Sequence, residues 1–323
     1  MCCKNTVYAI PFGIFAALFL ESMLYLILCI LFNALLVFIF KLYQVYRIRT
    51  FQAIVINYVI CLFTGALFDQ SALPIITQNI GASWMWASWL LGSLFIGGFY
   101  LIAITTQRIG VSAATVAMKT SLVIPVLFSL LILQNTLKDY TFLNYLGMAL
   151  ALVAIVVTSR RSKTEEVGSL SLMDWALPVI VFFSAGAGDV IINYTNDQLL
   201  QPEQAGAFTI STFAASAAIG SLVLLYQVIV KKVPFEKKNL VAGIGLGIPN
   251  FFSIYFLVKA LSAFQNDGAF LYPVNNIGII LVATLGGMLF FKERLTKSGW
   301  FGLLLAVTAL LLISYQEVVQ ILF

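Results

Sequence analysis

The sequence predicts an all-α integral membrane protein with ten transmembrane helices arranged as two inverted five-helix repeats. The membrane class follows from composition: 61% of the 323 residues are hydrophobic, only 10% are charged, and the mean hydropathy is +1.01. Soluble domains are about half apolar and a quarter charged, so no single core can hide this much apolar surface and lipid must act as the solvent. The repeats follow from a doubling of the chain at a spacing of about 155 residues.

The apolar stretches have the length and pattern of helices. Each lasts roughly 20 residues without a two-residue alternation, which favours membrane helices over the strands of a barrel. From residue 23 onward we predict ten spans, at 23–41, 51–69, 84–104, 111–134, 140–159, 174–195, 205–230, 239–259, 268–291 and 299–316.

The first 22 residues do not follow this pattern, because their apolar run is short and contains Pro11. Three interpretations are open: a signal-peptide hydrophobic region, an extra short or interfacial helix, or an extension upstream of a start at Met23. The third is favoured because Met23 opens the first clean span. The predicted organisation is therefore an N-terminal extension or extra short helix at 1–22, a first five-helix repeat at 23–160, a polar linker at 161–173 and a second repeat at 174–323.

Basic residues alternate between the loops and predict an orientation. The odd-numbered loops hold Lys41, Arg47, Arg49, Arg108, Arg160, Arg161, Lys163, Lys231, Lys232, Lys237, Lys238, Lys292, Arg294 and Lys297, whereas the even loops hold only Lys138 and Lys259. The positive-inside rule places the odd loops in the cytoplasm and both ends of the ten-helix core outside. We expect a multi-pass protein of the cell's inner or plasma membrane. The net charge of +5 thus indicates topology and not nucleic-acid binding.

The two halves share small and polar residues at the common spacing. The pairs are Gly65 and Gly220, Tyr100 and Tyr255, Ala114 and Ala269, Thr141 and Thr296, and Gly147 and Gly302. Because each unit holds an odd number of spans, the two copies lie in the membrane with opposite orientation. Inverted repeats of this kind are typical of secondary transporters, whose site lies near the midplane where the copies meet.

The ends of the copies carry a resemblance to a known family. The stretch Phe291–Thr296 (Phe-Lys-Glu-Arg-Leu-Thr), followed by Trp300–Gly302, resembles the acidic-Arg-Leu turn before the last helix of EamA-type transporters in the drug/metabolite transporter superfamily. Leu137–Gly147 is a degenerate version, and Val111–Ala114 with Pro125 fits the same pattern. The resemblance covers 23–316 and implies a ten-helix fold and transport. Many members are drawn with both termini cytoplasmic, opposite to the charge count, so both orientations stay open.

Composition also limits the chemistry. The chain has no histidine, so it lacks His-based triads and His-ligated metals, and its four cysteines show no metal-ligand spacing. No phosphate-binding G-x-x-x-x-G-K-[ST] motif occurs. We therefore expect no enzyme activity, no cofactor, no metal and no nucleic-acid partner; the expected partners are a small-molecule substrate and the lipid bilayer, and a homodimer is left open.

Two ionisable residues are predicted deep inside spans, where a charge is expensive and usually functional. Lys119, in the fourth span, suits an anionic group on a substrate. Asp189, in the sixth, is a candidate carrier of a coupled proton, because loss of hydration favours the neutral carboxyl group. Polar residues beside proline and glycine interruptions are further candidates for substrate binding or coupling: Asn193, Asn250, Asn275 and Asn276. Asn57, Tyr255 and Tyr272 are added as polar residues within the spans.

The sequence thus favours a secondary transporter of a small organic metabolite, working by alternating access and with proton coupling left open. The alternatives are a membrane channel and a membrane-embedded enzyme. A channel predicts rings of like charge, and an enzyme predicts clustered catalytic groups at a membrane face. Neither pattern is present in the sequence.

Overall fold

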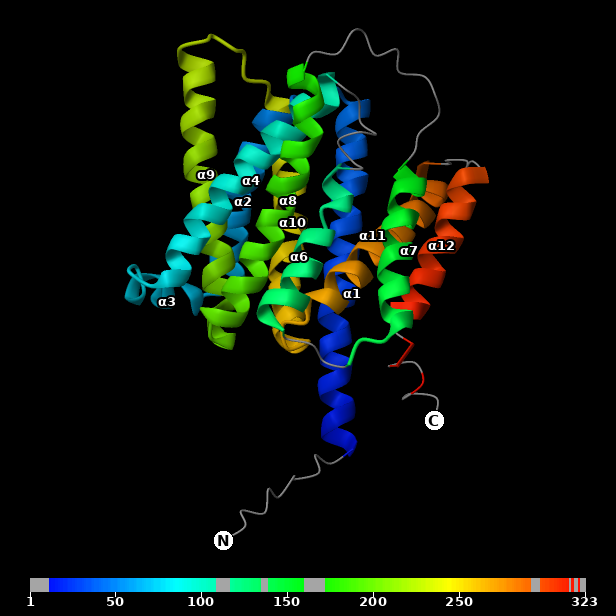
Figure 1. The fold of residues 1–323 in the computed structure, drawn as a ribbon. Helices are drawn as coiled ribbons and strands as arrows, with labels where there is room; N and C mark the ends of the chain where they lie inside the picture. Colours follow the sequence, from blue (N-terminus) through cyan, green and yellow to red (C-terminus); the bar gives the residue numbers. More distant parts are fainter. Residues whose placement is uncertain are drawn as a thin grey trace.

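The computed structural model describes residues 12–108, 117–134, 139–159, 172–291 and 297–313, together with 315, 316 and 319, and this part of the chain is all-helical, without a strand. The helices stand side by side as a bundle (Figure 1). Its α-helices are α1 Phe12–Val45, α2 Thr50–Phe68, α3 Ala72–Gln78, α4 Ser83–Arg108, α6 Val123–Phe128, α7 Phe142–Ser159, α8 Leu172–Gln198, α9 Ala205–Ile229, α10 Lys237–Ala263, α11 Gly268–Phe291 and α12 Lys297–Ile313.

Among the residues that the structure describes, seven helical segments are long and apolar enough to cross a membrane, and all fall on predicted spans. They are Glu21–Tyr43, Thr50–Phe68, Ser83–Ile102, Ala176–Gln198, Pro202–Ile229, Lys237–Ala263 and Gly268–Phe290. The predicted spans 111–134, 140–159 and 299–316 hold shorter apolar helices, at Ala117–Leu133, Phe142–Ala154 and Trp300–Ile313. Within the first of these, a π-helical turn Ser129–Leu133 follows α6 and ends at Gln134, whose φ of 55° is left-handed.

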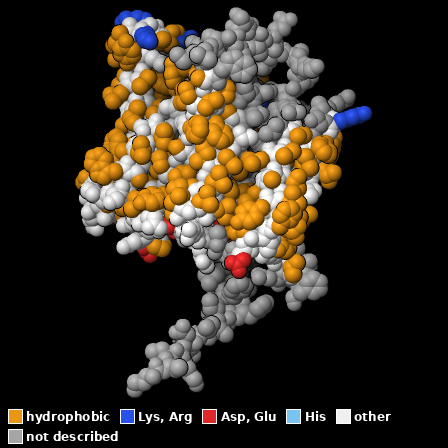
Figure 2. Space-filling model, viewed as in Figure 1, with side chains coloured by type: hydrophobic (Ala, Val, Ile, Leu, Met, Phe, Trp, Pro, Cys, Tyr) orange, Lys and Arg blue, Asp and Glu red, His pale blue; other side chains and the backbone are white. Residues whose placement is uncertain are grey.

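The surface matches a protein surrounded by lipid. Figure 2 shows hydrophobic side chains over most of one face, Lys and Arg at its upper edge and Asp and Glu at its lower edge. Large apolar side chains such as Leu222, Leu289 and Phe290 are exposed on the outside of the bundle. Helices satisfy their own backbone hydrogen bonds, which lipid cannot do. The chain is therefore a multi-pass membrane protein.

The two ends of the bundle differ in charge, and we name them accordingly. The basic end holds the loops around Arg49 and Lys231, and the opposite end holds Asp69, Asp197 and Asp267. At the basic end Glu236 Oε1 lies 2.7 Å from Arg49 Nε and Oε2 lies 2.9 Å from Lys238 Nζ. The hydrogen bond from Lys238, with a contribution from Arg49, lowers the pKa of the Glu236 carboxyl group. This contact therefore weakens when the pH falls below the ordinary carboxyl range.

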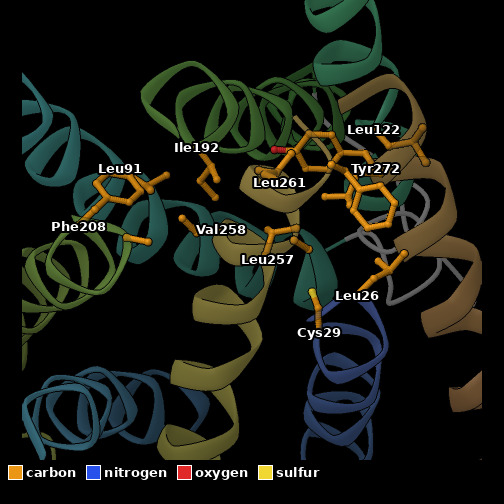
Figure 3. Packing of buried hydrophobic residues seen from close by; sticks show 14 of the residues in the cluster. Leu26, Cys29, Leu91, Leu122, Ile192, Phe208, Leu257, Val258, Leu261 and Tyr272 are labelled. Carbon is orange, nitrogen blue, oxygen red and sulfur yellow. The ribbon is translucent and has the colours of Figure 1, made fainter. Parts of the chain in front are cut away.

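Inside the bundle α2, α4, α9 and α10 form a closely packed group. The helix α2 packs on α9 and α10, and α4 packs on α9. The helices α1 and α8 flank this group, because α1 packs on α10 and α8 packs on α4, while α7 and α12 pair with each other. The shared core contains large buried side chains, including Phe208, Ile192 and Leu261 (Figure 3).

Glycines allow the closest approaches in this group. A Cβ atom placed on Gly247 of α10 lies 2.5 Å from Ile60 Cβ and 2.8 Å from the carbonyl oxygen of Asn57 on α2. On α4, a Cβ placed on Gly92 lies 2.6 Å from Ala215 Cβ on α9 and 2.6 Å from the carbonyl oxygen of Thr212. Small residues at such crossings let helix backbones pack tightly in lipid, where no hydrophobic effect holds the helices together.

Substituting Gly247 with Ala is therefore expected to destabilise the protein by about 1–3 kcal/mol, because the added methyl group overpacks the α2–α10 contact. Gly245 is the matched control on the same helix, since a Cβ there meets no atom of the described residues within 4 Å. Gly245→Ala should be neutral or stabilising by up to about 1 kcal/mol. Thermal unfolding in detergent measures both. Equal melting temperatures for the two variants would contradict the packing described.

Some sequence expectations fall outside the described residues. The linker 161–171, the stretch Val111–Ala114 and the residues 292–296 of the acidic-Arg-Leu turn are among them. The helix α1 begins at Phe12 and continues without a break past Met23. The three interpretations of 1–22 stay predictions.

Candidate functional site

A cavity of about 230 Å³ lies between α1, α4, α8, α10, α11 and the segment Ala117–Leu122. Its wall is mainly apolar, with a small number of polar side chains, as is usual for small-molecule sites. The polar lining residues are Asn33, Lys119, Ser121, Ser184, Asp189, Tyr272, Asn275 and Asn276. Five of the predicted site residues, Lys119, Asp189, Tyr272, Asn275 and Asn276, therefore share one cavity.

The two predicted intramembrane charges face this cavity from different parts of the chain. Lys119 lies in the short helix that begins at Ala117, and Asp189 lies on α8. Both side chains are half-buried, and their opposite charges interact electrostatically. No direct ion pair joins them in the described part of the chain. Each charge partly offsets the cost of placing the other in lipid, while both stay available to a solute.

A chain of hydrogen bonds connects the two charged positions through α11. Lys119 Nζ donates to Asn276 Oδ1 at 3.4 Å, and Asn276 Nδ2 donates to the carbonyl oxygen of Tyr272 at 3.0 Å. The Tyr272 hydroxyl donates to the backbone carbonyl of Asp189 at 2.7 Å. Tyr272 therefore fixes α11 against α8 at the position where Asp189 enters the cavity.

The amides of α1 and α11 meet at a buried cysteine. The Cys29 thiol contacts Asn275 Oδ1 at 3.4 Å and the Ser253 carbonyl at 3.5 Å. Asn33 Nδ2 donates to the Cys29 carbonyl at 2.9 Å. Pro273 lies two residues before Asn275 and removes a backbone N–H from α11. The cavity wall thus contains several groups that can donate or accept hydrogen bonds.

Hydrogen bonds join the helices at the opposite end of the bundle. Asn196 Nδ2 on α8 donates to Asn266 Oδ1, in the turn between α10 and α11, at 2.6 Å, and to Ser262 Oγ on α10 at 3.1 Å. Tyr140 donates to Asp267 Oδ1 at 2.8 Å. These contacts join α8, the α10–α11 turn and the residues before α7.

The other predicted site residues lie outside the cavity. Asn193 is fully buried on α8, and neither amide atom has a hydrogen-bond partner among the described residues. Asn250 Nδ2 donates to Asn57 Oδ1 at 3.1 Å, in the contact between α10 and α2. Tyr255 packs on the ring of Phe251 with centroids 5.6 Å apart. The structure does not bring these four residues to the cavity.

Three polar lining residues were not predicted. Asn33 lies in the middle of the first span, where its amide in an otherwise apolar run was a usable signal. Ser121 and Ser184 offered no such signal, because serine is common wherever membrane helices pack closely.

Comparisons with known proteins support transport. No family model matches the chain. The chain is 27% identical over 232 residues to an uncharacterized protein of Haemophilus influenzae. The aligned region covers 70% of this chain and 74% of the relative. It is 27% identical over 286 residues to the glucose uptake protein GlcU of Staphylococcus xylosus, covering 86% of this chain and 89% of GlcU.

A solved protein structure shares the fold. It superimposes with a TM-score of 0.65 at 15% identity, covering 92% of this chain and 97% of the solved one. The apolar helices and the similarity to a glucose uptake protein together support a multi-pass membrane transporter.

Proposed function

We propose that this chain is a secondary transporter that moves a small polar organic solute by alternating access through the central cavity. The observation that carries the proposal is the cavity itself, which holds Lys119 and Asp189 at bilayer depth between packed helices. Intramembrane charges that face a cavity typically mark a solute or ion pathway. At the opposite end the hydrogen bond from Asn196 to Asn266 joins α8 to the α10–α11 turn, as we expect of a carrier that is closed on one side. The similarity to an uptake protein favours a carrier over an enzyme.

Alternating access needs two units that can rock against each other, and helix boundaries support two inverted five-helix repeats. The spans Glu21–Tyr43 and Ala176–Gln198 begin and end about 155 residues apart. The helices α2 and α9 begin at Thr50 and Ala205, and α7 and α12 begin at Phe142 and Lys297, at the same spacing. We call this the repeat spacing.

Matching contacts give independent support for the repeats. The Cys61 thiol on α2 donates to the carbonyl of Gly247 at 3.2 Å, and the Ser216 hydroxyl on α9 donates to the carbonyl of Gly92 at 3.1 Å. Cys61 and Ser216 are one repeat spacing apart, and so are Gly92 and Gly247. The rings of Tyr58 and Phe213, also one spacing apart, contact each other with centroids 6.0 Å apart. A contact between equivalent positions lies on the two-fold axis that relates two copies.

The cavity spans this axis. Four pairs of its lining residues are separated by the repeat spacing: Asn33 and Gly188, Phe99 and Ile254, Ile102 and Leu257, and Ser121 and Asn276. A site shared by both copies is the arrangement found in transporters with inverted repeats. The resemblance of 23–316 to EamA-type drug/metabolite transporters forms part of the same proposal.

The cavity suits a small hydroxylated solute. A volume of about 230 Å³ is below the range of drug-sized pockets, which begins at about 300 Å³. Amides such as Asn275 and Asn276 both donate and accept hydrogen bonds, and so do hydroxyl groups. A hexose is the first candidate, because GlcU, a relative aligned with 86% of this chain, is a glucose uptake protein. We propose Asp189 as the carrier of a coupled proton. The positive charge of Lys119 balances the Asp189 carboxylate when the cavity is closed.

Uptake by purified protein in proteoliposomes tests this function. Radiolabelled glucose, other hexoses, pentoses and a panel of organic acids are supplied with and without an inwardly directed proton gradient. We expect one class of neutral sugar to accumulate, faster when the gradient is present. Uptake that is unchanged by the gradient would contradict the proposed proton coupling. The absence of uptake of any solute would contradict the transporter proposal.

A further inference from the structure

The two halves of the cavity wall are unequal, although the repeats supply equivalent residues to both. Ser184 of α8 and Gly98 of α4 line the cavity, and a Cβ on Gly98 would lie 3.4 Å from Ser184 Oγ. One repeat spacing away, Cys29 of α1 contacts the Ser253 carbonyl of α10 at 3.5 Å. The same helix contact therefore exists twice, once at the cavity and once outside it.

The second contact is fully closed. Cys29 is 0% exposed and Ser253 1% exposed, and Figure 3 shows the Cys29 side chain pointing from α1 toward Leu257 of the cavity wall. Asn250, equivalent to the lining residue Phe95, is also buried and bonds to Asn57. The Asn57 amide nitrogen has no hydrogen-bond partner among the described residues. Buried polar groups without partners are costly, so the neighbouring Asn57–Asn250 pair, where α2 meets α10, contains a polar group able to bind a solute.

The two contacts also lie at different depths. Ser184 is eight residues from Ala176, the first residue of its span at the basic end, and Cys29 is eight residues from Glu21, at the opposite end. At about 1.5 Å per residue each lies roughly 12 Å inside its own end of the bundle. The cavity-lining contact at Ser184 therefore lies nearer the basic end, and the buried Cys29–Ser253 contact lies nearer the opposite end.

Resting on the proposed alternating access, we propose that the solute site has a second form, in which α1 and α10 separate and Cys29, Asn250 and Ser253 line a path to the opposite end. Exchange of the conformations of two inverted repeats converts one open side into the other. The contact between Ser184 and Gly98 then closes. Lys119 and Asp189 have the apolar equivalents Val274 and Ala34, so the second form adds no second pair of charges.

The chemistry of this second form indicates its ligand. It adds an amide, a hydroxyl and a thiol, and no ionisable carboxylate or amine. Such groups recognise a neutral solute by hydrogen bonds. Between α1 and α10 a solute therefore meets neutral donors and acceptors.

Native cysteines provide the test. One variant keeps only Cys29 (Cys2→Ser, Cys3→Ser, Cys61→Ser), and its matched control keeps only Cys61, whose thiol faces the packed α2–α10 contact in both forms. A membrane-impermeant methanethiosulfonate reagent is added to either side of oriented vesicles while the protein transports solute. Buried thiols react only when water and reagent reach them.

We expect Cys29 to react at least about tenfold faster than Cys61, from the opposite end only, and solute to slow the reaction. In a cysteine-free background, Ser184→Cys should react from the basic end, and Ser253→Cys should repeat the sidedness of Cys29. If Cys29 and Ser253→Cys are as unreactive as Cys61 while the same vesicles transport solute, the second form is wrong and the transporter stands. If no vesicles transport any solute, the proposed function itself fails.

Discussion

Replacing Asp189 with Asn, or Lys119 with Ala, is expected to reduce the initial rate of solute uptake by about ten- to a hundredfold. Each change removes a charged hydrogen-bonding group from the cavity, and such groups contribute about 1.5–3 kcal/mol. Each also leaves the opposite charge uncompensated in the membrane. Uptake is measured in proteoliposomes at equal amounts of folded protein.

Stability and transport are separated by the double variant Lys119→Met with Asp189→Leu. It removes both charges, so we expect its melting temperature to match or exceed that of the parent, whereas uptake stays lost. Asp139→Asn and Lys232→Ala, at exposed positions in loops, are the charge-matched controls and should transport normally. Normal uptake by either cavity variant would refute the assigned roles.

Filling the cavity from Gly98 is expected to reduce uptake by about tenfold or more without unfolding the protein. Gly98 lines the cavity, and the one described atom within 4 Å of a Cβ there is Ser184 Oγ, at 3.4 Å. The side chain of Gly98→Leu therefore extends into space that the solute needs. A methyl group alone, in Gly98→Ala, should have a smaller effect. Uptake and melting temperature are measured together.

The neighbouring glycine gives the control. Gly97 does not line the cavity, and a Cβ there meets no described atom within 4 Å. Gly97→Leu adds the same side chain at the same depth of α4, so it should leave uptake close to the parent value. Equal losses in the two variants would mean that α4 itself, and not the cavity, is sensitive to substitution.

The helical membrane fold could be predicted because lipid imposes a simple rule on the sequence. Each span needs about 20 apolar residues, and seven of the predicted spans hold helices of spanning length and composition. The sequence positions of the two intramembrane charges also predicted their depth in the membrane. Lys119 and Asp189 are isolated in apolar runs, so their depth was evident, and the structure brings both to one cavity.

Helix rotation was not predictable, and it decides which polar groups face the cavity. Asn193 lies one turn beyond Asp189, yet it faces the buried interior, and Asn250 faces Asn57 on α2. The spans are apolar on nearly all sides, so a single sequence gives no amphipathic pattern to orient them. The two glycines Gly245 and Gly247 show the same limit, because only the structure distinguishes an open position from a close helix crossing.

Counterflow in proteoliposomes tests the central claim most directly. Vesicles are loaded with a high concentration of unlabelled glucose, or of the solute that the uptake panel identifies, and are diluted into a trace of labelled solute. A carrier that alternates between two forms, each closed on one side, exchanges internal unlabelled solute for external labelled solute. Labelled solute should therefore accumulate in the vesicles transiently above its equilibrium level. Simple equilibration without an overshoot, in vesicles shown to be permeable to that solute, would indicate an open channel and contradict alternating access.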